Sequence, residues 1–130
     1  MSHTILLIED NVQNQYLTTF LLEQNGHKVV QAFDGPSGIE LARNIDPDLI
    51  LLDIQLPGMD GYAVSRALRA IELLKTTPIV AVTSYAMVGD REKSLEAGCN
   101  GYIEKPINPD TFVTEISQFL QHRDASQDPQ

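Results

Sequence analysis

The chain has 130 residues, a formal net charge of −9 at pH 7 and a single cysteine, Cys99. This length suits one domain with a hydrophobic core, and contents of 42% hydrophobic and 21% charged residues are ordinary for a globular protein. The negative charge argues against nonspecific nucleic-acid binding. No apolar run approaches the roughly 20 residues that span a bilayer, the N-terminus lacks a signal-peptide pattern, and one cysteine excludes an internal disulfide. We therefore expect a cytoplasmic protein without direct contact to nucleic acid or membrane.

Short apolar runs alternate with helical patterns from the N-terminus onward. The predicted strands cover residues 4–8, 28–32, 49–53, 78–82 and 101–104. The predicted helices cover residues 12–24, 36–44, 61–74, 88–97 and 109–121. The first, third and fourth strands are almost entirely apolar, as expected of strands buried on both faces. This alternation predicts an α/β fold with a five-stranded parallel sheet, doubly wound so that five helices flank it on both faces.

Capping residues and glycines support these boundaries. A capping residue stands at three helix starts, in Gly35-Pro36, Asp60-Gly61 and Asn108-Pro109-Asp110. Gly26 and Gly98 stand where helices should stop.

The last residues of the chain have a different composition. Residues 122–130 are polar, contain a proline and lack apolar periodicity, which predicts a disordered tail. We therefore expect one domain at residues 1–121, followed by no output domain in this sequence.

Four of the predicted strands deliver polar residues at their carboxyl ends. In chain order these residues are Glu9-Asp10, Asp53, Thr83-Ser84 and Lys105. Because the carboxyl ends of parallel strands share the edge of the sheet where such folds bind ligands, we expect these side chains to meet in one pocket. Three carboxylates, a hydroxyl and an ammonium group suit a divalent cation together with a phosphoryl group.

The carboxylates of Glu9, Asp10 and Asp53 would repel one another in such a pocket. Two of them about 4 Å apart cost roughly 4 kcal/mol at an effective dielectric constant of about 20, so a bound cation is the simplest reason to collect them. Mg²⁺ prefers carboxylates, a backbone carbonyl and water, and Gln55 in the following loop can supply the carbonyl. The alternative is that Glu9-Asp10-Asn11 only caps the first helix; taken alone, both hypotheses are equally supported.

The remaining residues of the pocket suit phosphoryl chemistry. Beside a metal ion, the carboxylate of Asp53 can attack phosphorus and form an acyl phosphate. Lys105 would offset the charge on Asp53 and then on a phosphoryl oxygen, and a cis bond to Pro106 would direct the lysine inward. The Thr83 hydroxyl and the Ser84 N–H can donate to phosphoryl oxygens. Each residue also has a purely structural interpretation, as a cap, a solvated lysine or a strand-end turn.

Together these segments resemble the motif set of two-component response regulator receiver domains. The resemblance covers residues 4–121 and rests on separated motifs in the family's order, which are Glu9-Asp10-Asn11, residues 53–61, Thr83-Ser84 and Lys105-Pro106. It implies a CheY-like, flavodoxin-like (βα)5 fold. Residues 81–90, 98–99 and 102–107 are particularly similar to DivK-type single-domain regulators, and receivers attached to hybrid kinases share these patterns.

The resemblance implies that Asp53 accepts a phosphoryl group from a phosphohistidine on a histidine kinase or a histidine phosphotransfer protein. It also implies a Mg²⁺ site and a phosphoryl-binding set. The implied metal ligands are Glu9, Asp10, Asp53 and the Gln55 carbonyl, and the implied phosphoryl-binding residues are Asp53, Thr83, Ser84 and Lys105.

The same resemblance gives Thr83 and Tyr102 the role of a switch pair. Thr83 would move toward the phosphoryl group, Tyr102 would follow inward, and the face formed by the fourth helix, fifth strand and fifth helix would change. That face would bind a downstream protein or a second copy of the chain. A half-buried strand aromatic without a switching role is the alternative for Tyr102. Gln55 and Tyr85 stand at the two positions that flank the phosphoryl group in this family and influence its hydrolysis. Because Tyr85 offers no carboxylate to orient water, we predict slow self-dephosphorylation.

Two other classes of function fit parts of the sequence. An Asp nucleophile with Mg²⁺ on an α/β sheet also describes haloacid-dehalogenase-type phosphatases, but these need a second Asp where this chain has Gln55. A flavodoxin-like cofactor binder needs a hydroxyl- and glycine-rich loop after the first strand, where Glu9-Asp10 would repel a phosphate. We therefore predict a signalling module that catalyses only its own phosphorylation and dephosphorylation.

Overall fold

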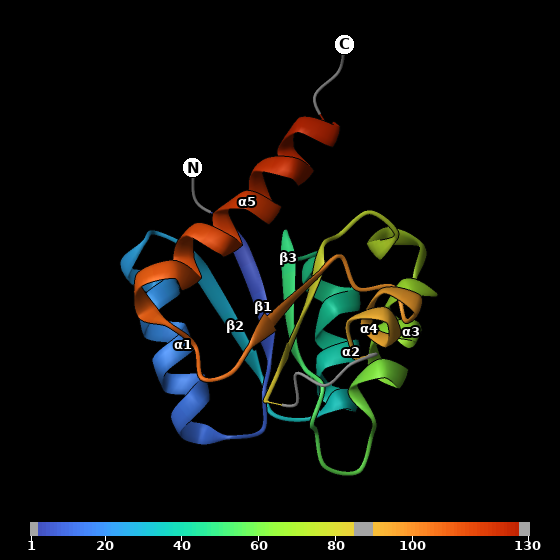
Figure 1. Ribbon diagram of the computed structural model, residues 1–130. Coiled ribbons are helices and arrows are strands. Elements are labelled where there is room, and N and C mark those ends of the chain that lie inside the picture. The colour runs from blue at the N-terminus through green and yellow to red at the C-terminus, as the bar shows by residue number, and fades with distance from the viewer. Residues whose placement is uncertain (1–2, 85–89, 128–130) are drawn as a thin grey trace.

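The computed structural model describes residues 3–84 and 90–127 and shows a central five-stranded sheet (Figure 1). The strands stand in the order β2-β1-β3-β4-β5, and every neighbouring pair is parallel. Their bounds are β1 Thr4–Ile8, β2 Lys28–Ala32, β3 Leu49–Asp53, β4 Ile79–Thr83 and β5 Gly101–Glu104. All five predicted strands are present, and only the fourth is displaced, by one residue.

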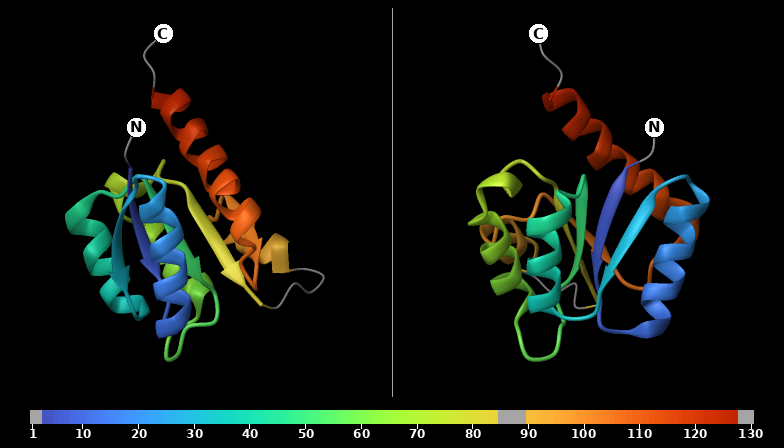
Figure 2. Two further views of the ribbon diagram at one scale, coloured as in Figure 1. Left: turned by 90° about the vertical axis from the view of Figure 1, so that its left-hand side faces the viewer. Right: turned by 180° about the vertical axis from the view of Figure 1, so that it is seen from behind.

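Helices cover both faces of this sheet, as the two views of Figure 2 show. Their bounds are α1 Val12–Gln24, α2 Gly35–Ile45, α3 Gly61–Arg69, the short 3-10 helix η1 Glu72–Leu74, α4 Asp90–Glu96 and α5 Pro109–Gln127. α1 and α5 pack on one face through Leu22 and Ile116, and α2 and α3 pack on the other, where Val64 is buried. α4 ends beside α3, because the Ser65 hydroxyl donates to the Ala97 carbonyl. The predicted doubly wound α/β fold is confirmed.

Burial on both faces explains the apolar runs in β1 and β3. Successive strand residues point to opposite faces, so alternate residues of one strand enter different cores. In β1, Leu6 and Ile8 belong to the core under α2 and α3, whereas Ile5 and Leu7 belong to the core under α1 and α5. Every position of β3 is buried as well, including Asp53 at its carboxyl end.

Side-chain caps fix the helix starts. Asp60 and Asn108 cap α3 and α5 as predicted, because each accepts a hydrogen bond from a backbone N–H of the first turn. The cap of α2 is Asp34, whose carboxylate accepts from the Ser37 N–H at 2.8 Å. The prediction placed this cap in Gly35-Pro36 and is wrong by one residue, since neither glycine nor proline has a side chain that can accept a hydrogen bond.

The third predicted helix, at residues 61–74, is interrupted. α3 ends at Arg69, and Ile71 has extended backbone with φ −83° and ψ 122° before η1 begins. The side chain of Arg69 provides the reason, because its guanidinium donates to the carbonyls of Leu74 and Thr77 at 2.7 and 2.6 Å. These bonds hold a turn that a continuous helix cannot make, although Leu74 keeps its buried position.

Glycines follow α1 and α4 as predicted, whereas α5 continues beyond its predicted end. Gly26 and Gly98 follow α1 and α4 with φ of 86° and 99°, a left-handed conformation that glycine adopts easily. α5 reaches Gln127, so it includes residues 122–127, which were predicted to belong to a disordered tail. No glycine or proline occurs between Asp110 and Asp128, so nothing stops the helix where its apolar periodicity ends.

Parts of three predictions lie outside the described residues. They are the first two residues of the predicted helix 88–97, the end of the predicted tail at 128–130, and Tyr85. Across the described ranges, none of the helices is long and apolar enough to cross a membrane.

Candidate functional site

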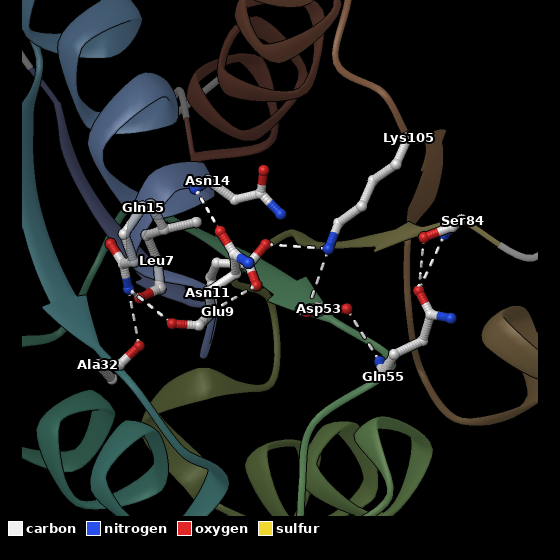
Figure 3. A network of polar contacts seen from close by, with 10 residues as sticks. All are labelled: Leu7, Glu9, Asn11, Asn14, Gln15, Ala32, Asp53, Gln55, Ser84 and Lys105. Carbon is white, nitrogen blue, oxygen red and sulfur yellow. Dashed lines mark hydrogen bonds and ion pairs between the residues drawn. The ribbon is translucent and has the colours of Figure 1, made fainter.

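The structure brings most of the predicted site residues together at the carboxyl edge of the sheet, and Figure 3 shows Glu9, Asp53 and Lys105 there. Asp53 ends β3, the central strand, while Glu9 directly follows β1 and Thr83 ends β4, the strands on either side. Glu9, Asp53 and Thr83 are buried, with exposed fractions of 4%, 3% and 2%. Buried carboxylates at this depth need partners, because their desolvation is costly.

Lys105 is the cation of the site. Its Nζ lies 3.0 Å from Glu9 Oε1 and 3.2 Å from Asp53 Oδ2 (Figure 3). The Lys105 N–H donates to the Thr83 carbonyl at 2.7 Å, which extends the pairing of β4 and β5 beyond the end of β5. The bond between Lys105 and Pro106 is cis, as the sequence suggested.

One ammonium group does not balance this cluster. The pKa of Glu9 is raised to about 7, chiefly by burial and also by its contact with Asp53. Burial alone would lower the pKa of Lys105, but its hydrogen bond to Glu9 and the negative charges of Asp53 and Glu9 outweigh that effect and raise it. The site therefore carries more negative charge than its own lysine neutralises.

The carboxylates are spaced as metal ligands. Glu9, Asp10 and Asp53 each offer one oxygen, and these oxygens lie within 4.8 Å of one another. Asp10 is exposed whereas the other two are buried, so the cluster is reached from solvent on the side of Asp10. Three carboxylate oxygens in this arrangement suit a hard divalent cation such as Mg²⁺. The pKa of Glu9 is raised chiefly by burial and also by its contact with Asp53, and a bound cation would favour the ionised form of this carboxyl.

The alternative role of Glu9-Asp10-Asn11 as a helix cap holds for one of the three residues. Asn11 is the N-cap of α1, and its side chain accepts from the Asn14 N–H at 2.9 Å. Glu9 instead points into the site, where its Oε2 accepts from the Asn11 N–H at 3.1 Å. The cap and the acidic cluster are therefore neighbouring features with different residues.

Gln15 is a part of the site that the sequence analysis missed. It lies in α1, is 1% exposed, and its Nε2 donates to the carbonyls of Leu7, Glu9 and Ala32 at 3.2, 3.2 and 2.8 Å (Figure 3). These bonds tie α1 to the ends of β1 and β2 and fix the backbone at Glu9. The sequence gives only a weak indication that Gln15 is buried. Gln15 stands two helical turns before Leu22, which places both residues on the inner face of α1.

Gln55 gives the two oxygens of Asp53 different surroundings. The Gln55 N–H donates to Asp53 Oδ1 at 2.9 Å, whereas Lys105 contacts Oδ2. The side chain of Gln55 extends away from Asp53 and contacts Ser84, directly after β4 (Figure 3). The Gln55 carbonyl as a metal ligand stays a prediction.

Tyr102 lies on β5 and belongs to a different surface. It is half-buried, packs against the core under α2 and α3, and lines a cavity of about 200 Å³ between α4, β5 and α5. Leu95 and Phe119 line the same cavity, and Leu95 is exposed. This position agrees with both predicted roles of Tyr102, so the switch pair stays a prediction.

Comparison with known proteins identifies the family. The model of the response regulator receiver domain matches residues 5–117. The chain belongs to this family. It is 39% identical over 120 residues to the polar-differentiation response regulator DivK of Brucella ovis, covering 92% of this chain and 98% of that protein, and 38% identical to DivK of Brucella anthropi. The predicted receiver of two-component signalling is confirmed.

Solved structures agree with this assignment. The receiver domain of a sensor histidine kinase from Pseudomonas aeruginosa PAO1 has a TM-score of 0.81 and 38% identity, over 94% of this chain and 97% of that one. That crystal structure has a magnesium ion coordinated in its active-site cleft. A CheY-like receiver domain protein from Methanospirillum hungatei has a TM-score of 0.90 and 28% identity, over 97% and 99% of the two chains.

Proposed function

We propose that this receiver is switched by phosphorylation of Asp53, with a phosphohistidine as the donor. The observation that carries the proposal is the buried carboxylate of Asp53, held 3.2 Å from Lys105 beside Glu9 and Asp10. An oxygen of Asp53 would bond to phosphorus as the P–N bond of the donor breaks, and the released imidazole would take up a proton. The donor is a histidine kinase or a histidine phosphotransfer protein.

Glu9, Asp10 and Asp53 would hold Mg²⁺, together with the backbone carbonyl of Gln55. The ion would supply positive charge to the phosphoryl oxygens during transfer. The spacing of the three carboxylates supports this assignment, since three carboxylates share the site with one ammonium group. The magnesium ion in the receiver from Pseudomonas aeruginosa supports it as well.

Lys105, Thr83 and the Ser84 N–H would bind the phosphoryl oxygens, because they are donors at the carboxyl ends of β4 and β5, and β4 pairs with the strand that carries Asp53. The chemistry would remain confined to this chain's own phosphorylation and dephosphorylation. An enzyme that turns over an external phosphate ester would need an acid or base next to the nucleophile. Gln55 stands at that position and its side chain is bonded to Ser84.

The outer surface of α1 would receive the phosphodonor protein. Val12, Tyr16 and Phe20 are 71%, 72% and 47% exposed, and they recur every four residues along one face of the helix. A cleft of about 330 Å³, lined in part by Leu17 and Lys105, continues this surface to the site. An apolar surface that leads to Asp53 fits a partner that must bring its histidine there.

The signal would leave through the face of α4, β5 and α5. Thr83 would follow the phosphoryl group and Tyr102 would change its packing beside the 200 Å³ cavity. The exposed Leu95 at this cavity gives the face an apolar contact for a downstream protein or a second copy of the chain.

The proposal is tested by intact mass after incubation with acetyl phosphate, with and without Mg²⁺. We expect one Mg²⁺-dependent phosphoryl adduct that Asp53→Asn abolishes and that Asp46→Asn, at an exposed position after α2, retains. No adduct on the unmodified chain, under conditions that label another receiver, would contradict the proposal.

A further inference from the structure

Gln55 links the nucleophile to the residue that follows β4. Its backbone N–H donates to Asp53 Oδ1 at 2.9 Å. Its side-chain Oε1 accepts two hydrogen bonds from Ser84, one from the N–H at 3.0 Å and one from the hydroxyl at 2.9 Å. Figure 3 shows this connection on the side of Asp53 away from Glu9.

The orientation of the Gln55 amide follows from its partner. A backbone N–H can only donate, so the atom that faces the Ser84 N–H must be the carbonyl oxygen Oε1 and not the amino group Nε2. The Ser84 hydroxyl shares the same oxygen. Two donors satisfy both lone pairs of Oε1, so the contact is complete as it stands.

This contact occupies a donor that the phosphoryl group would use, an argument that rests on the proposed function. A phosphoryl group on Asp53 adds three acceptor oxygens and no donor. The Ser84 N–H has one hydrogen, which already points to Gln55 Oε1. Because a single N–H cannot donate fully to two oxygens, the phosphoryl group and the Gln55 side chain compete for it.

We propose that the hydrogen bonds from Ser84 to Gln55 Oε1 form a latch that holds the end of β4 in its resting arrangement and opens when Asp53 is phosphorylated. Gln55 is then a positioning residue that sets how readily the phosphoryl group gains the Ser84 N–H. The exchange runs forward because a hydrogen bond to a charged phosphoryl oxygen is about twice as strong as one to a neutral amide. The lost amide contact subtracts from the gain and weakens phosphoryl binding.

The test uses beryllofluoride with Mg²⁺, a phosphoryl mimic that binds carboxylates, on the full chain. Gln55→Met keeps the length of the side chain and the backbone N–H but removes the acceptor. One net hydrogen bond changes an equilibrium by about two- to tenfold, so we expect beryllofluoride to bind about two- to tenfold more tightly. Gln24→Met, at the exposed end of α1, is the matched control and should bind as the unmodified chain does.

A second measurement reports the latch without a phosphoryl mimic. In the resting protein the Ser84 amide hydrogen should exchange slowly with solvent, and Gln55→Met should accelerate that exchange. Ser84→Ala removes only the hydroxyl, so its effect on beryllofluoride affinity should be smaller than that of Gln55→Met. The two substitutions should not be additive, because they act on one oxygen.

The outcomes separate the latch from the proposed function. Equal or weaker beryllofluoride binding by Gln55→Met, or unchanged exchange of the Ser84 amide, would overturn the latch and leave the receiver function intact. No Mg²⁺-dependent binding of beryllofluoride to the unmodified chain would overturn the proposed function, and with it the role of the latch.

Discussion

Two partly buried cations, Arg69 and Lys105, tie loops together at opposite ends of the sheet, and their partners differ in kind. Arg69 donates to the carbonyls of Leu74, Thr77 and Gly98 and to the side chain of Asn100, all of which are neutral. Lys105 contacts two carboxylates. Arg69 holds the connections before β4 and β5, whereas Lys105 lies where the carboxyl ends of the strands meet.

In our proposal the difference distinguishes a structural contact, at Arg69, from a functional one, at Lys105. The donors of Arg69 meet neutral oxygens, so this group contains no carboxylate that is left without a cation. Around Lys105, three carboxylates face one ammonium group, and the pKa of Glu9 is raised to about 7. The first group is complete within the fold, and in our proposal the second becomes complete with a bound cation and a phosphoryl group.

The largest expected effect is on phosphoryl transfer in Lys105→Met. Removing one preorganised cation from a transfer site costs about 10²- to 10³-fold in rate, so labelling by acetyl phosphate should slow by about that factor. Lys75→Met is the matched control, since Lys75 forms an exposed ion pair with Glu72. A labelling rate in Lys105→Met within threefold of the unmodified chain would show that this lysine does not serve transfer.

Arg69→Met should reduce stability and leave the rate of labelling by acetyl phosphate nearly unchanged. Loss of the guanidinium leaves several carbonyls without a partner, so the free energy of unfolding should fall by about 3 kcal/mol. The labelling rate of the folded protein should change by less than about twofold, because the hydrogen-bond partners of Arg69 lie at the opposite end of the sheet from the site. Urea unfolding measures the first quantity, with Arg66→Met, exposed on the same helix, as control. A stability loss below about 0.5 kcal/mol would refute the structural role.

The pH dependence of stability gives a smaller effect that follows from Glu9. In the metal-free protein, the pKa of Glu9 is about 7, above its ordinary value of 4.5. The folded state therefore binds more protons than the unfolded state between these values, and stability should fall as pH rises through this window. We expect a loss on the order of 2 kcal/mol, measured by urea unfolding in EDTA.

Glu9→Gln should remove this dependence and raise stability above pH 7. Glu40→Gln, exposed on α2, should leave the dependence as it is. A stability that stays level or rises between pH 5 and pH 7.5 in the unmodified chain would contradict the raised pKa of Glu9.

The sequence predicts the site better than it predicts the contacts that surround it. Asp53, Thr83 and Lys105 were predictable because each follows an apolar run, and parallel strands bring such ends to one edge. The same rule placed Glu9 and Asp10 beside them. The pattern of apolar residues carries this information locally, so no knowledge of tertiary contacts was needed.

The features that the sequence did not predict depend on contacts between distant residues. Arg69 ends α3 early through carbonyls of the following loop. Gln15 is a polar residue on the inner face of α1, and its partners belong to β1 and β2. Gln55 meets Ser84 across 29 positions of the chain. Apolar periodicity reports which face of an element is buried and does not report where a buried polar side chain finds its partner.

Stabilisation by Mg²⁺ tests the central claim most directly, because an incomplete acidic cluster should gain from a cation. At about 100 times its dissociation constant, Mg²⁺ should raise the free energy of unfolding of the unmodified chain by about 2.7 kcal/mol. Arg69→Met should show the same gain, whereas Asp53→Asn should lose most of it and be more stable than the unmodified chain in EDTA. No gain with Mg²⁺, or an equal gain in Asp53→Asn, would contradict the account.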